Sequence, residues 1–310
     1  MNTKNIMNQK IKLAKLITKI ENEHSDSENI LKNIWKNVGN AYRIGITGPP
    51  GSGKSTLVNQ LALHLNKQNL KIAIISVDPS SPFGGGALLG DRIRMNELSL
   101  NPNIYIRSLA TRGSLGGLSM KTQDICDIID SFGYDIILIE TVGVGQIELD
   151  IMDTADTTIV VLVPESGDDI QSMKAGLMEI GDIFVINKAD RDGATSLENN
   201  LNSILQLKNQ YKNNFKYEIP VIKTVATKNK NIDLLLENLL KHKKILKENK
   251  NWTLMRKKRL ENKLNELINA HLNRLFWTEE RKISIENIFN NKIENIETPH
   301  NIYEKLLKKF

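Results

Sequence analysis

The chain has 310 residues, of which 40% are hydrophobic and 25% are charged. This is the composition of a soluble globular protein, long enough for one large domain with helical additions rather than two equal domains. Much of the positive net charge of +6 lies in lysine-rich runs of the C-terminal third. No aromatic stacking pattern accompanies these runs, so solvated helix faces are favoured over nucleic-acid binding.

Cysteine usage and hydropathy exclude further classes of protein. The single cysteine, Cys126, rules out an intrachain disulfide framework and a C-x-x-C metal site. The N-terminus lacks the uninterrupted apolar segment of a secretory signal, and no window offers the roughly 18 consecutive apolar residues of a membrane span. We therefore expect a cytoplasmic protein that makes no contact with membranes.

Residues 1–40 are predicted to form a helical extension before the first strand. Ser25 and Glu28 have the spacing of a capping box at a helix N-terminus. The apolar residues that follow share the spacing of one helix face: Ile30, Leu31, Ile34, Trp35 and Val38. We expect this face to pack on the domain that follows.

From residue 41 onward, short apolar runs alternate with helical patterns. Runs such as Ile136–Ile139 are continuously aliphatic, as is typical of strands buried on both faces of a parallel sheet. The sequence therefore predicts a doubly wound, mainly parallel α/β domain over residues 41–248. The expected strands are residues 42–47, 71–77, 104–107, 134–140, 157–163, 183–187 and 220–225.

The sheet pattern ends near residue 231, and residues 232–246 predict a closing helix. A long charged helix follows, with an apolar stripe at three- and four-residue spacing: Leu260, Leu264, Leu267, His271 and Leu275. Such a stripe either folds back on the domain or pairs with a second copy of the chain. The spacing favours pairing, so residues 249–310 are predicted to be the helical arm of a homodimer.

A glycine-rich turn joins the first strand to the next helix and fits the pattern G-x-x-x-x-G-K-[ST]. In this context backbone N–H groups and the helix dipole converge on an anion. The Lys54 ammonium would reach the β- and γ-phosphates, and the Ser55 hydroxyl would ligate Mg²⁺. A nucleoside triphosphate site is therefore favoured over a chance glycine turn. The turn consists of Gly48, Pro49, Pro50, Gly51, Ser52, Gly53, Lys54, Ser55 and Thr56.

Two further strand ends predict the base. In a doubly wound sheet the base lies at the carboxyl ends of the strands, where Asn187, Lys188 and Asp190 form the pattern N-K-x-D. A carboxylate accepts hydrogen bonds from N1–H and the exocyclic amine of guanine, whereas adenine offers an acceptor at N1. The predicted base is therefore guanine. The last strand ends in a second group of base-side candidates, with the Ala226 N–H directed at guanine O6: Thr224, Val225 and Ala226.

Carboxylates at other strand ends predict the phosphate side of the site. Glu140 closes a buried strand, where GTPases hold magnesium or its waters, and an unpaired carboxylate in a core would be costly. The Gly143 N–H is a candidate contact to the γ-phosphate, whose loss would release the loop. Asp78 and Asp91 flank a glycine run and are candidates for magnesium coordination or for orienting the attacking water. The alternative for that run is a surface loop with incidental acids.

Four segments together resemble the MeaB/ArgK/MMAA family of P-loop GTPases, in the SIMIBI class, which are chaperones of cobalamin-dependent methylmalonyl-CoA mutase. The resemblance is close over residues 40–230 and holds only in outline for the helical flanks. The segments are residues 78–95, 107–118, 140–146 and 167–176.

The resemblance implies a dimeric GTPase that binds GTP or GDP with Mg²⁺ and assists adenosylcobalamin loading, protection and reactivation of the mutase. It also implies that Asp78, Asp91 and Glu140 surround the magnesium ion and act in catalysis with Lys54. Residues 164–173 would then form an additional switch that transmits the nucleotide state to the mutase.

The chain departs from the family pattern at three places. Gly84 stands where the family usually has Thr, and Ile147 stands where Ser is common. Both changes affect the expected mobility of the switches. Glu165 adds a charge to the segment expected to couple to the partner. None of these positions belongs to the predicted phosphate or base contacts.

Two other functions stay open. One is a kinase or ATPase acting on an amino-acid (arginine/ornithine) transport protein, an older label within the same family. A kinase needs a base for the substrate hydroxyl and usually adenine specificity, and the guanine contacts oppose the latter. The other is a nucleotide-dependent scaffold, for this or another acyl-CoA mutase. No Gln or Arg finger can be assigned from the sequence, so hydrolysis is expected to be slow without a partner.

Overall fold

The computed structural model describes residues 3–78, 98, 100–110, 117–141, 153–165, 175–211, 217–290 and 297–307. The chain divides into two compact units, Met1–Met255 and Arg256–Phe310. Within the described part of the chain, no helix combines the length and the apolarity that crossing a membrane requires.

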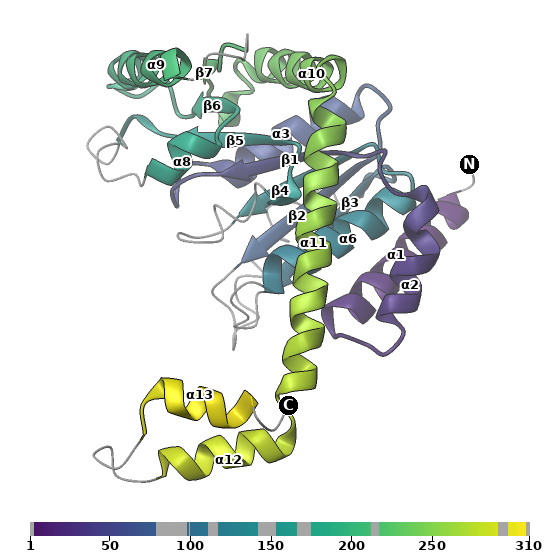
Figure 1. The fold of residues 1–310 in the computed structure, drawn as a ribbon. Helices are drawn as coiled ribbons and strands as arrows, with labels where there is room; N and C mark the ends of the chain where they lie inside the picture. The colour runs from purple at the N-terminus through teal and green to yellow at the C-terminus, as the bar shows by residue number, and fades with distance from the viewer. Residues whose placement is uncertain are drawn as a thin grey trace. The chain divides into compact units, whose positions relative to one another are not determined.

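The first unit is built on a seven-stranded sheet whose order is β3-β2-β4-β1-β5-β6-β7 (Figure 1). Every neighbouring pair of these strands is parallel. The chain builds one side of the sheet through β2, β3 and β4 and the other side through β5, β6 and β7, so β1 stands at the point where the order reverses. The strands are β1 (Tyr42–Thr47), β2 (Ile72–Asp78), β3 (Ile104–Ala110), β4 (Ile136–Thr141), β5 (Thr157–Leu162), β6 (Ile183–Ile186) and β7 (Val221–Lys223).

Alternating side chains of the strands feed two apolar clusters on the two faces of the sheet. In β4, Ile136 and Leu138 join one cluster, and Ile137 and Ile139 join the other, as the two-residue period of a strand requires. This explains why the central strands are continuously aliphatic, and the predicted doubly wound α/β class is confirmed. The helices and turns of this unit are α1 (Thr3–Glu21), α2 (Ser27–Ile34), η1 (Trp35–Asn37), α3 (Lys54–Asn66), α6 (Gly117–Ser131), α8 (Ala175–Ile180), α9 (Ala194–Tyr211), η3 (Ala226–Lys228) and α10 (Ile232–Glu248).

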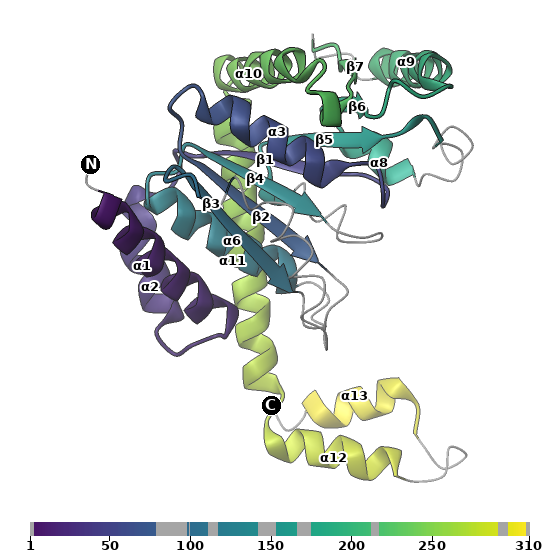
Figure 2. The same ribbon diagram turned by 180° about the vertical axis from the view of Figure 1, so that it is seen from behind.

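The helices divide between these two clusters. Leu57 of α3 and Leu235 of α10 belong to the cluster that contains Leu138. Residues of α1, α6 and α9 belong to the other cluster, where α1 and α2 lie against α6 (Figure 2). The phosphate-loop helix α3 is therefore packed between the sheet and solvent on the face that it shares with α10.

The helical N-terminus is confirmed, but the capping box is wrong. α2 begins at Ser27, and its N-cap residue is Asp26, whose side chain makes no capping hydrogen bond. The Asp26 carboxylate instead pairs with Lys19 of α1 at 3.0 Å. The expected apolar face is also shorter than predicted, because Trp35 lies beyond the end of α2 and is 48% exposed.

The second unit consists of helices. Its N-terminal helix, α11 (Asn251–Phe276), starts in the first unit and is followed by α12 (Glu279–Phe289) and α13 (Pro299–Leu307). Leu264 and Leu267 of the predicted stripe are about half exposed in the single chain. Their pairing with a second copy stays a prediction.

A buried histidine links the closing helix to the middle of the sheet. His242 of α10 is 5% exposed, and its Nδ1 lies 2.8 Å from the Thr157 hydroxyl of β5. That hydroxyl also contacts the Tyr42 hydroxyl of β1. Burial lowers the pKa of His242 to about 4, although Asp182 lies 3.9 Å from its Nε2. The imidazole is therefore neutral at neutral pH.

This burial makes stability depend on pH. The unfolded histidine has an ordinary pKa near 6.5, so between about pH 6.5 and 4 the unfolded chain takes up a proton that the native state does not. The contribution of His242 to the free energy of unfolding is complete above that window and is lost as the pH falls through it. We expect wild type to lose about 2 kcal/mol more than His242→Gln between about pH 7 and pH 4.5 in urea denaturation. The exposed His271→Gln variant is the control and should follow wild type; equal losses in all three proteins would contradict the account.

Candidate functional site

The glycine-rich turn between β1 and α3, called the phosphate turn below, passes very close to neighbouring strands. Gly48 has φ +138°, and a Cβ at this position would lie 2.1 Å from the backbone oxygen of Val161 in β5. Gly53 has φ +87° and precedes α3; a Cβ there would lie 2.4 Å from the side-chain nitrogen of Asn187. At both positions the backbone conformation and the neighbouring atoms require glycine.

The phosphate-side residues of the turn contact one another and the adjacent strand. Lys54 is buried, and its ammonium donates to the backbone oxygens of Gly48 at 2.7 Å and Pro49 at 3.0 Å. The Ser55 hydroxyl donates to Glu140 Oε1 at 2.6 Å. Glu140 is 1% exposed and is aligned with Ile46, one residue before the end of β1. The structure therefore brings Lys54, Ser55 and Glu140 to one end of β1 and β4.

Ser55 and Glu140 have the donor chemistry of a magnesium site. A hydroxyl and a carboxylate oxygen, with phosphate oxygens and water completing the shell, are the ligands that Mg²⁺ takes in nucleotide enzymes. The hydroxyl and the carboxylate already face each other at 2.6 Å, so both residues fit this ion. They would hold it directly or through its waters.

The remaining phosphate-side predictions are described only in part. Asp78 ends β2, which pairs with β4, so its backbone lies at the same end of the sheet as Glu140. Its side chain lies outside the described residues, as do Asp91 and Gly143. The departures at Gly84 and Ile147 and residues 166–173 of the predicted switch also lie outside them. Glu165 is described and forms an ion pair with Arg191, which lowers the pKa of its carboxyl.

Asn187 joins the phosphate turn to the last strand. It follows β6 and is 3% exposed. Its side-chain nitrogen donates to the backbone oxygen of Ser52 at 2.9 Å, and its oxygen accepts from the Thr224 hydroxyl at 3.2 Å and the Ala226 N–H at 3.1 Å. The Ala226 N–H, which we predicted to point at guanine O6, is thus used in this structure to position Asn187.

Lys188 has the same kind of supporting contact. Its backbone is left-handed, with φ +55°, and its ammonium donates to the backbone oxygen of Gly51 at 2.7 Å. Together with Asn187, it holds the turn by two carbonyl oxygens, at Gly51 and Ser52. These contacts use carbonyls and not the N–H groups that an anion would need, although the Ser52 N–H donates to the Pro49 oxygen at 3.2 Å.

Asp190 is the acidic residue that the sequence predicts beside the base. Its side chain is 41% exposed, and Oδ2 accepts from the Lys228 ammonium at 2.7 Å. This hydrogen bond lowers the pKa of the Asp190 carboxyl. The carboxylate is therefore ionised at neutral pH and acts only as an acceptor, which is what the two N–H groups of guanine require.

The sequence analysis missed four residues that support the site: His64, Lys228, Asn229 and Asp233. Nδ1 of His64, in α3, lies 2.7 Å from Asp233 Oδ1, and its Nε2 lies 2.8 Å from Asn229 Oδ1. These contacts fasten the segment after η3 to the helix that begins at Lys54. His64 carries no sequence signal beyond a helical position. Asn229, with φ +55°, is of the residue type that favours a left-handed turn, and this signal could have located the turn.

The close approach of Gly53 to Asn187 can be tested by substitution. Gly53→Ala should weaken GTP binding by about tenfold or more, because a Cβ displaces the Asn187 side chain and strains the left-handed backbone. Fluorescence titration with a labelled GTP analogue measures this. Gly133→Ala is the matched control: its φ is +75° but no atom lies within 4 Å of the added Cβ. This control should lose stability and keep its affinity. Equal affinities in both variants would contradict the packing argument.

Comparison with known proteins gives one consistent result. A model of the family described as methylmalonyl-CoA mutase-associated GTPase MeaB matches residues 13–281. A putative GTPase of Pyrococcus horikoshii is 50% identical over 256 residues, which are 83% of this chain and 81% of the relative. The mouse mitochondrial methylmalonic aciduria type A homolog is 39% identical over 203 residues, 60% of this chain and 48% of that protein.

One solved structure shows the same fold over its whole length. It is a crystal structure of a protein described as an LAO/AO transport system kinase, with a TM-score of 0.70 and 24% sequence identity. The match covers 99% of this chain and 98% of that chain. At this identity the likeness concerns the fold alone.

Proposed function

The chain belongs to the MeaB family of methylmalonyl-CoA mutase-associated P-loop GTPases, and from this premise we propose that it binds GTP with Mg²⁺ and hydrolyses it to GDP and phosphate. The observation that carries the proposal is the contact of the Ser55 hydroxyl with the buried Glu140 carboxylate at 2.6 Å. This contact between a hydroxyl of the turn and a strand-end carboxylate supports a Mg²⁺ site at the residue that follows Lys54.

The phosphates would lie against the turn. Its backbone N–H groups and the N-terminus of α3 attract negative charge. Lys54 would exchange the carbonyls of Gly48 and Pro49 for β- and γ-phosphate oxygens. Ser55 and Glu140 would hold Mg²⁺, which neutralises charge on the phosphates when it is bound.

The base would lie beside Asp190. Its ionised carboxylate accepts from N1–H and the exocyclic amine of guanine, whereas adenine would place an acceptor against it. Asn187 and Lys188 act one step away, because they hold the turn through Ser52 and Gly51. The base and the phosphates are thus bound by parts that are already fastened to one another.

The partner in this proposal is a cobalamin-dependent acyl-CoA mutase, with methylmalonyl-CoA mutase first. Its support is the description of the family, and the name of the mouse relative agrees with it. The protein would assist adenosylcobalamin loading, protection and reactivation, and its hydrolysis would be slow until the mutase binds. A homodimer through the apolar stripe of α11 completes the proposal, because Leu264 and Leu267 are about half exposed in the single chain. The guanine-directed Asp190 disfavours the kinase alternative.

Sedimentation of the protein with methylmalonyl-CoA mutase and a non-hydrolysable GTP analogue tests the nucleotide and the partner together. We expect a complex in the presence of the analogue. In a separate assay with GTP itself, we expect the mutase to stimulate hydrolysis roughly tenfold or more. Asp190→Asn should form the complex with the XTP analogue instead, because an amide can pair with O2 and N1–H of xanthine. The control Asp192→Asn changes an exposed acid two residues away and should keep the GTP preference.

The possible outcomes separate the parts of the proposal. Absence of a complex and of stimulation, with guanine preference intact, would contradict the mutase as partner. Unchanged guanine preference in Asp190→Asn would contradict the base assignment. The protein sedimenting alone should have about twice its 35.0 kDa chain mass, and a monomer would contradict the proposed dimer.

A further inference from the structure

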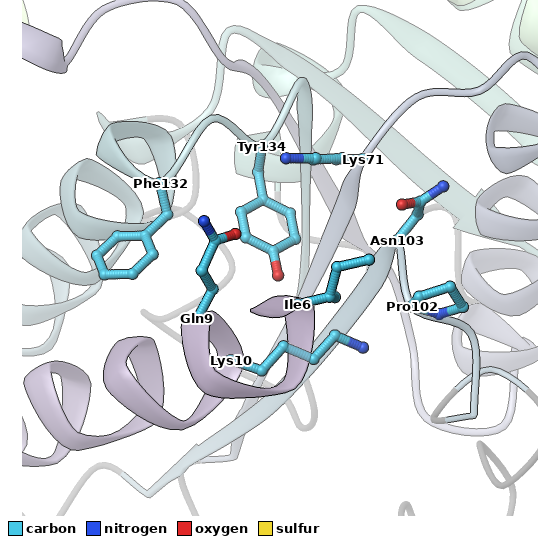
Figure 3. A pocket seen from close by; sticks show the side chains of 8 residues that line it. All are labelled: Ile6, Gln9, Lys10, Lys71, Pro102, Asn103, Phe132 and Tyr134. Atoms are coloured by element: carbon cyan, nitrogen blue, oxygen red, sulfur yellow. The ribbon is translucent and has the colours of Figure 1, made fainter. Parts of the chain in front are cut away.

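A cavity lies at the end of the sheet opposite to the phosphate turn. The turn follows the carboxyl end of β1, whereas this cavity is lined by residues that precede strands: Lys71 before β2, Asn103 before β3 and Tyr134 before β4. Its volume is about 230 Å³. The first helix, α1, closes it with Gln9 and Lys10 (Figure 3). All of these residues belong to the first unit.

The cavity is lined by a tyrosine hydroxyl that has no partner in the described part of the chain. Tyr134 is 8% exposed, and its hydroxyl makes no hydrogen bond with any residue of the described ranges. Figure 3 shows this hydroxyl directed toward the side of α1 that carries Gln9. Burial raises the pKa of Tyr134, so the hydroxyl stays protonated and is a donor at physiological pH. A donor that lines a cavity and has no acceptor in the described part of the chain indicates a place for a ligand oxygen or a water.

Other donors share the cavity. The Lys71 ammonium and the side-chain amides of Gln9 and Asn103 form no hydrogen bonds within the described part of the chain. The Lys10 ammonium donates to the backbone oxygens of Asn101 at 2.8 Å and Ile104 at 2.6 Å, which fixes it in the wall of the cavity. Its third N–H has no acceptor among the described residues. Burial lowers the pKa of Lys10, an effect that a bound anion would offset.

The charge of the lining has one sign. Two lysines face the cavity, and among its described lining residues none is acidic. The carboxylate of Asp135, the residue after Tyr134, accepts from the backbone N–H of Lys71 at 2.8 Å. The rings of Phe132 and Tyr134 supply an apolar wall beside these donors. Polar groups beside an aromatic wall are the usual composition of a small-molecule site.

We propose that this cavity binds a small organic anion, a carboxylate or phosphate monoester with a compact apolar body. Its volume is below the roughly 300 to 1,000 Å³ of sites for drug-sized ligands, which excludes a nucleoside triphosphate. The anionic group accepts from the Tyr134 hydroxyl and is attracted by the charges of Lys71 and Lys10, and the apolar body packs on Phe132. Because Gln9 and Lys10 lie on α1 while the other donors precede strands, the ligand joins α1 to the sheet. The site is separate from the GTP site and does not depend on its assignment.

Ligand-observed saturation-transfer NMR on the full chain tests the proposal. The probe is benzoate, with phenyl phosphate as the second anion and benzyl alcohol as the neutral control. Excess GDP is present so that phenyl phosphate does not report on the phosphate turn. We expect Kd values on the order of 1 mM for both anions and binding at least about tenfold weaker for benzyl alcohol.

Single substitutions assign the binding to this cavity. Tyr134→Phe removes only the hydroxyl and should weaken benzoate binding about fivefold, and Lys71→Met removes the charge and should weaken it about tenfold. Lys67→Met, an exposed lysine that does not line the cavity, should bind like wild type. Thermal melting confirms that each variant is folded, and either cavity variant alone decides the result.

Three results would overturn the proposal. They are no benzoate binding at concentrations roughly tenfold above the expected Kd, equal binding of benzyl alcohol, or unchanged benzoate affinity in a folded Tyr134→Phe or Lys71→Met variant. Weaker binding of phenyl phosphate than of benzoate would restrict the ligand class to carboxylates, and the reverse would restrict it to phosphates.

Discussion

The site depends on how closely the phosphate turn approaches its neighbours. A Cβ on Gly48 would lie 2.1 Å from the Val161 oxygen, and one on Gly53 would lie 2.4 Å from the Asn187 amide. This contact is possible only because both residues lack a side chain. The approach lets β5 and Asn187 support the turn from beneath, and the Asn187 contact uses a carbonyl rather than an N–H group that a phosphate would need. It also sets the Ser55 hydroxyl against the Glu140 carboxylate at 2.6 Å, which is the donor pair of the proposed magnesium site.

Asn187 extends this constraint from the phosphates to the base. Its side-chain nitrogen donates to the backbone oxygen of Ser52, and its side-chain oxygen accepts from Thr224 and Ala226. The three segments that surround a nucleotide are therefore held by one buried side chain, and His64 adds a second connection from α3 to the segment after η3. A site assembled in this way needs little reorganisation when a nucleotide binds.

The sequence predicts the fold well because its signals are local. Continuous aliphatic runs such as Ile136–Ile139 can be satisfied only by strands covered on both faces, and the glycine turn requires a strand before it and a helix after it. The errors concern the two ends of α2. Asp26 pairs with Lys19 rather than capping the helix, and Trp35 lies beyond its end. No sequence motif marks the cavity beside Tyr134, because its donors come from four separate segments that meet only in the folded chain.

The central claim is that the strand-end residues form a guanine-specific triphosphate site. Isothermal titration of the full chain with GTP and with ATP, each in the presence of Mg²⁺, tests it most directly. A site built to accept the two N–H groups of guanine rejects a base that lacks them, because a charged acceptor would be left against another acceptor. The account predicts GTP binding at least about a hundredfold tighter than ATP binding. Equal affinities, or a preference for ATP, would contradict it.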